Sequence, residues 1–125
     1  MFGGIGLTGR GRIIPQMSLV FSTESVEIEG GHLSGGLLEL GNAVLALFWE
    51  GERPVLGSTT LTLPSKVSSQ LVGDRDQLLG QMIGEYLAKH FGKMALVSTN
   101  LKPGTASVAG RALIEMARRL AEKMS

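Results

Sequence analysis

The chain has 125 residues, of which 43% are hydrophobic and 18% charged, and its formal net charge is +1. This length and composition predict one folded domain with its own core, and they exclude a wholly disordered chain. A net charge so close to zero gives no support for binding nucleic acid or an anionic membrane surface. Cysteine is absent, which excludes a disulfide framework and a thiolate zinc site. No apolar run has the length of a membrane span and no signal peptide is apparent, so we expect a cytoplasmic protein.

Residues 1–16 are rich in glycine and predict a flexible tail, followed by a single α+β domain over residues 17–125. The tail contains Gly4-Ile-Gly6-Leu-Thr-Gly9, which matches the spacing of the dinucleotide-binding fingerprint. That fingerprint binds a cofactor only where a strand precedes it and a helix follows. We expect neither around these glycines, and we therefore predict no cofactor.

The first half of the chain predicts strands separated by turns. Val26 and Ile28 alternate with two glutamates, and the glycines on either side of His32 and Ser34 predict a loop or bulge. Gly41-Asn42 predicts a hairpin turn. Five strands are expected before the first helix, over residues 17–23, 26–29, 37–40, 43–49 and 55–63.

The fourth of these strands, Ala43–Trp49, is the most informative stretch of the chain. It holds seven consecutive apolar residues between Gly41-Asn42 and the polar sequence that begins at Glu50. A strand with one solvated face alternates apolar and polar residues, and this one does not. We therefore expect a strand that is buried on both faces.

Two amphipathic helices are expected in the second half, with a strand over Met94–Val97 between them. Asp74 or Asp76 is placed to cap the first helix and Gly92 to end it, and Thr105 or Ser107 is placed to begin the second. The apolar stripe expected on the first helix is Leu78, Leu79, Met82, Ile83, Tyr86, Leu87 and Phe91.

This order of elements predicts an α+β fold, namely an antiparallel sheet of about six strands with two helices on one face. Two helices with one apolar stripe each cover only one face, so we expect the second face to pack against another sheet in a dimer. The alternative is that residues 1–16 fold back over that face. On residue size we assign to the dimer interface the set Ala43, Leu45, Leu47 and Trp49.

Residues that could carry out catalysis or bind a metal are sparse. Ser34 lies two positions from His32, but no acidic residue is near in sequence to complete a nucleophilic site. His90 falls in the last turn of a helix, where a structural role is expected. The spacing of Asp74 and Asp76 suits helix caps better than calcium ligands. We predict no enzyme activity and no metal site.

Three segments resemble a known family: Leu45-Ala-Leu-Phe-Trp-Glu-Gly51, Val67-Ser-Ser-Gln-Leu-Val-Gly73-Asp74, and the stretch from Leu87 through Val97-Ser-Thr-Asn-Leu101. With the final helix, they are similar to the chaperones that assist assembly of the 20S proteasome α-ring, in particular the fourth assembly chaperone, with the third as a more distant relative. The resemblance covers residues 37–124.

The resemblance implies a non-enzymatic chaperone that pairs with a third-chaperone-like subunit or with itself and holds α-type proteasome subunits. Residues 1–36 do not share it. The end of the chain, Lys123-Met-Ser125, lacks the hydrophobic-Tyr-x tail of other proteasome assembly factors, so docking has to use a surface. The candidates for that docking surface are Arg111, Arg118 and Arg119 on the last helix.

A homodimeric scaffold of the longin or roadblock type, which regulates small GTPases, is the alternative. Those folds usually place a helix between their second and third strands, whereas five strands are expected here before any helix.

Overall fold

The computed structural model describes residues 19, 21–73 and 75–124. The predicted tail over residues 1–16 lies outside the described residues. In chain order the elements are β1 (Ser22–Ile28), β2 (Gly31–Glu39), β3 (Ala43–Glu50), β4 (Ser58–Thr62), β5 (Ser68–Val72), α1 (Gln77–Phe91), β6 (Met94–Asn100) and α2 (Thr105–Lys123).

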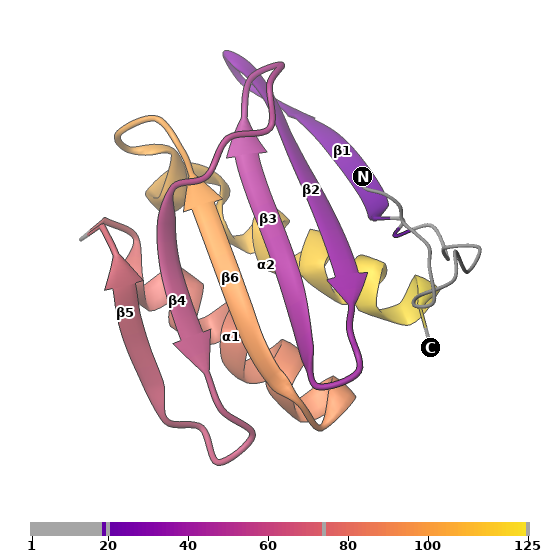
Figure 1. Ribbon diagram of the computed structural model, residues 1–125. Coiled ribbons are helices and arrows are strands. Elements are labelled where there is room, and N and C mark those ends of the chain that lie inside the picture. The colour runs from indigo at the N-terminus through magenta and orange to yellow at the C-terminus, as the bar shows by residue number, and fades with distance from the viewer. Residues whose placement is uncertain (1–18, 20, 74, 125) are drawn as a thin grey trace, which may run out of the picture.

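The strands form one sheet in the order β1-β2-β3-β6-β4-β5, and both helices lie on the same face of it (Figure 1). Helix α1 packs on β4 and β6, and α2 packs on β1 and β2. The predicted α+β fold with six strands and two helices on one face is therefore confirmed.

The sheet is mixed, which corrects the expectation of a purely antiparallel one. β3 and β6 run parallel, while the other neighbouring strands run antiparallel. Helix α1 returns the chain from the β5 edge, and β6 then enters the sheet between β3 and β4. Since β3 and β4 run in opposite directions, a strand inserted between them has to be parallel to one of them.

Strand β2 runs continuously where the sequence predicted a loop or bulge around His32 and Ser34. Its glycines serve packing, because a Cβ atom at Gly35 would lie 2.7 Å from Cδ1 of Phe48 and 2.8 Å from Sδ of Met116. Phe48 and Met116 are both fully buried, and they occupy the space that a side chain at position 35 would need.

Strand β5 was not predicted, because Ser68, Ser69 and Gln70 carry no apolar pattern. It is paired with β4 through side chains as well as backbone. The Thr60 hydroxyl donates to Oε1 of Gln70 at 2.8 Å, and the hydroxyls of Thr62 and Ser68 lie 2.8 Å apart. Polar residues therefore pair this edge strand, and hydrophobic periodicity does not detect such a strand.

The predicted stripe of α1 is confirmed except at its first and third residues. Leu79, Ile83 and Leu87 are buried, and Tyr86 and Phe91 are partly buried against the core. Leu78 and Met82 are 70% and 49% exposed. Gly80 and Gly84 instead face the sheet, where an added Cβ would lie 2.9 Å from Oγ1 of Thr60 and within 3.0 Å of Thr62. The buried residues of the helix are Leu79, Gly80, Ile83, Gly84, Leu87 and Ala88.

The helix ends agree in part with the sequence. Gly92 ends α1 in a left-handed conformation, with its N–H bonded to the Ala88 carbonyl, as predicted. Asp76 precedes α1 but makes no side-chain capping bond, and Asp74 lies outside the described residues. Helix α2 begins at Thr105, one of the two predicted starts.

Candidate interaction surface

The alternation of β3 decides which of its residues face the helices. Val44, Ala46 and Phe48 are fully buried in the core between the sheet and the helices. Leu45, Leu47 and Trp49 point to the other face, where they are partly exposed. The set that the sequence assigned to a dimer interface thus lies on the face without helices, although its fourth member, Ala43, is itself buried at 4% exposure.

The strand register extends this surface into a row of leucines across four neighbouring strands. Leu38 of β2 is opposite Leu45 of β3, Leu45 is opposite Leu96 of β6, and Leu96 is opposite Leu61 of β4. Leu38 is nearly buried, and the other three are partly exposed. We call this surface the leucine face and define it as Leu38, Leu45, Leu47, Trp49, Leu61 and Leu96.

Sequence reasoning missed Leu38, Leu61 and Leu96 as members of this surface. Each lies in a segment with apolar residues, but only the strand order brings the three together around Leu45. The one available signal concerned Leu96, because all four residues of the predicted strand Met94–Val97 are apolar.

A shallow apolar hollow lies at one side of the leucine face. It encloses about 260 Å³ and is lined by Phe21, Thr23, Gly36, Leu47, Trp49 and Pro54. Gly36 leaves room for Phe21, whose Cδ1 would be 3.3 Å from an added Cβ. This volume is small for a drug-sized ligand and suits one or two side chains of a protein partner.

Both helices lie on the opposite face of the sheet, so no element among the described residues covers the leucine face (Figure 1). Soluble monomers rarely leave a contiguous apolar patch of this kind in water. The arrangement suits packing against a second apolar sheet, in which the two inner faces interdigitate at a spacing of about 10 Å.

The three arginines predicted for partner docking differ in their surroundings. Arg118 is paired with Glu115 and Glu122 on its own helix. Arg119 donates from Nε to Glu24 of β1 at 3.1 Å. Arg111 is exposed and has no ion pair within the described part of the chain. Arg118 is therefore paired within α2, and Arg119 connects α2 to β1. Docking through the three arginines stays a prediction.

Glu24 of β1 forms ion pairs with Arg119 and Lys123 of α2. The hydrogen bonds from Arg119 and from Lys123, whose Nζ lies 3.3 Å away, hold the pKa of this carboxyl below its usual value of 4.5. Because the folded state lowers this pKa, the stabilisation is complete above pH 4.5 and is lost as pH falls through the folded value.

We therefore expect Glu24→Gln to lower the free energy of unfolding by about 0.5–1 kcal/mol at pH 7 and by much less at pH 3. Urea denaturation at the two pH values measures this difference. Glu27→Gln, which changes an exposed carboxyl on the other face of β1, is the control and should show a smaller effect at pH 7. An equal loss at both pH values for Glu24→Gln would show that the ion pair is not its cause.

Among the described residues, Ser34 and His32 share no hydrogen bond with each other or with a carboxylate. Ser34 lies on β2 opposite Trp49, and its hydroxyl is 2.9 Å from that of Ser25. His32 is opposite Glu27 in the β1–β2 register. The His90 ring is tilted against that of Tyr86 and edge-to-face with that of Phe91, with centroid distances of 5.7 and 4.8 Å.

The described residues contain no group of three or more histidine, aspartate or glutamate side chains placed to hold a metal ion. None of the described helices is both long enough and apolar enough to cross a membrane.

Fold and surface together define a two-layer α+β protein with an open apolar sheet face. No protein-family model matches the chain, and no curated protein matches it in sequence. Among solved structures it is similar to a chain of a chaperone complex for yeast 20S proteasome assembly, with a TM-score of 0.67 and 10% sequence identity. The match covers 86% of this chain and 98% of that one. At this identity the likeness shows a shared fold.

Proposed function

We propose that this protein is a non-enzymatic chaperone subunit that assists assembly of the 20S proteasome α-ring and acts as one half of a dimer. The observation that carries the proposal is the leucine face, an apolar sheet surface that no described element covers. Its occurrence in a fold like that of a yeast proteasome-assembly chaperone supports this function over other binding roles. The resemblance of residues 37–124 to the same family supports it independently at the level of sequence motifs.

In this proposal the leucine face packs against the sheet of a third-chaperone-like subunit or of a second copy of this chain. Burial of a leucine side chain contributes roughly 1.5–3 kcal/mol when it is complete. Several partly exposed leucines and one tryptophan therefore each supply a fraction of this amount to association. The dimer then holds α-type proteasome subunits through surfaces outside this interface.

The order of elements favours this function over the longin or roadblock alternative. Between residues 21 and 73 the structure describes five strands and no helix. The alternative folds usually place a helix between their second and third strands, which is where the short β2–β3 hairpin turn lies here.

Co-purification tests the proposal directly. A tagged copy of the full chain is expressed in cells of the organism that it comes from and purified under mild washing conditions. The recovered complex is analysed by native mass spectrometry and peptide identification. We expect a complex that contains one further small subunit or a second copy, together with α-type proteasome subunits. Recovery of a monomer with neither a small partner nor α-type subunits would overturn the proposal.

A further inference from the structure

A groove between the N-terminal halves of α1 and α2 forms a second apolar surface. Its lining residues belong to the two helices and the residue before α1. Both helices lie on the opposite side of the sheet from the leucine face (Figure 1). The groove encloses about 480 Å³, a volume within the range of protein binding pockets. The residues that line it are Asp76, Leu78, Leu79, Met82, Ala106, Ser107, Gly110, Arg111 and Ile114.

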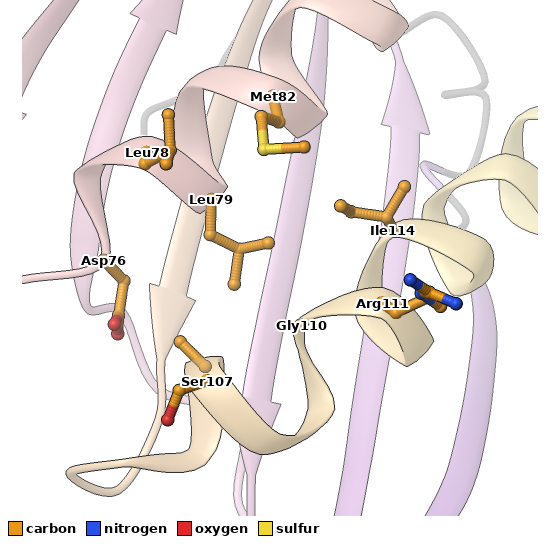
Figure 2. Close-up of a pocket in the computed structure, with 9 residues that line it drawn as sticks. Asp76, Leu78, Leu79, Met82, Ser107, Gly110, Arg111 and Ile114 are labelled. Atoms are coloured by element: carbon orange, nitrogen blue, oxygen red, sulfur yellow. The ribbon is translucent and has the colours of Figure 1, made fainter.

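The walls of this helix groove are aliphatic and open to solvent. Figure 2 shows Leu79 and Met82 of α1 and Ile114 of α2 around the space between the two helices. Leu78 and Met82 are 70% and 49% exposed. Single exposed leucines are common on protein surfaces, but here several apolar side chains surround one hollow. Gly110 of α2 widens the helix groove, because glycine has no side chain to fill it.

The groove has one charged residue at each end, and neither forms an ion pair within residues 19, 21–73 and 75–124. Arg111 and Asp76 lie on opposite sides of the apolar space (Figure 2). Arg118 and Arg119 further along α2 are both paired with glutamates, whereas Arg111 has no ion pair among the described residues. Asp76 likewise makes no side-chain capping bond to α1. A bound molecule with a carboxylate beside Arg111 would be attracted by this arginine and repelled by Asp76.

We propose that the helix groove binds a peptide segment of a partner protein, which inserts an aliphatic side chain between α1 and α2 and places a carboxylate against Arg111. The repulsion from Asp76 fixes the direction of the segment. A second copy of this chain is the poorer occupant, because two concave grooves facing each other do not fill one another. The proposal goes beyond the proposed function and does not depend on what packs on the leucine face, since the two surfaces lie on opposite sides of the sheet.

Fluorescence anisotropy with two synthetic peptides tests the proposal on the full-length protein. The peptides share one central pair of leucines and differ only in ending with two glutamates or two lysines. We expect the acidic peptide to bind about two- to fivefold more tightly, as for a partly exposed ion pair. Arg111→Glu should reverse this preference, and Leu78→Asp should weaken both peptides.

Lys89→Glu is the matched control, because it makes the same charge change on an exposed cation of α1 outside the groove. It should leave the preference unchanged. In methyl NMR spectra we expect the acidic peptide to shift Met82 and Ile114.

The proposal would be overturned by equal binding of both peptides in the unmodified protein, by no binding of the acidic peptide at about 1 mM, or by shifts confined to Leu45 and Leu47. Self-association that Leu78→Asp abolishes would also overturn it, by placing a second copy in the groove. None of these results alters the co-purification test of the proposed function.

Discussion

Trp49→Asp is expected to separate the two subunits of the dimer proposed above while leaving the helical content of each subunit intact. Trp49 lies on the leucine face, partly exposed, so its replacement removes no side chain from the core between sheet and helices. In a sheet-to-sheet dimer the aspartate would be buried without a partner. An unpaired buried charge costs about 3–5 kcal/mol, which raises the dissociation constant at least about 100-fold. Sedimentation velocity measures the mass, and circular dichroism measures the helical content.

Leu47→Asp should have the same effect, because Leu47 lies on the same face of β3. Val108→Asp is the control: Val108 is 81% exposed on α2, in the other layer of the molecule. It should leave the complex intact. A complex of unchanged mass in both Trp49→Asp and Leu47→Asp would show that the leucine face is not the interface, whatever partner is present.

One local feature of the sequence made part of the leucine face predictable. Seven apolar residues in succession at Ala43–Trp49 indicated a strand without a polar face, and the structure buries alternate residues of β3 under the helices. Local sequence could not show that Leu38, Leu61 and Leu96 continue the surface. Their proximity arises from β6 entering the sheet between β3 and β4, a pairing of segments that are distant in sequence.

Glycine accounts for two of the errors in the predicted elements. Glycine is common in turns, and the glycines around His32 and Ser34 therefore predict a loop or bulge there. The structure shows that Gly35 makes room for Phe48 and Met116 within a continuous strand. The predicted stripe of α1 is wrong at Leu78 and Met82 for a related reason. Hydrophobic periodicity does not count glycine as a packing residue, although Gly80 and Gly84 face the sheet. Leu78 and Met82 were therefore placed in the core, and they lie instead on the helix groove.

Gly84→Ala should destabilise the protein, because α1 lies very close to β4 at this position. A Cβ atom there would lie 2.3 Å from Oγ1 and 3.0 Å from Cβ of Thr62, a short β-branched side chain that is fully buried. Overpacking costs up to about 3 kcal/mol, and alanine regains about 1 kcal/mol through helix propensity. We expect a net loss of about 1–2 kcal/mol in the free energy of unfolding, measured by urea denaturation at fixed protein concentration.

Gly110→Ala is the matched control, because it makes the same substitution inside a helix where the nearest atom to an added Cβ is Cδ1 of Leu79 at 3.8 Å. With only ordinary contact there, propensity should dominate and stabilise the protein by about 0.5–1 kcal/mol. Combining Gly84→Ala with Thr62→Ala should cost less than the two single losses added together, since the second change removes the atom in closest conflict. If Gly84→Ala instead stabilises the protein as Gly110→Ala does, α1 does not approach β4 this closely, and the small residues on its inner face have no packing role.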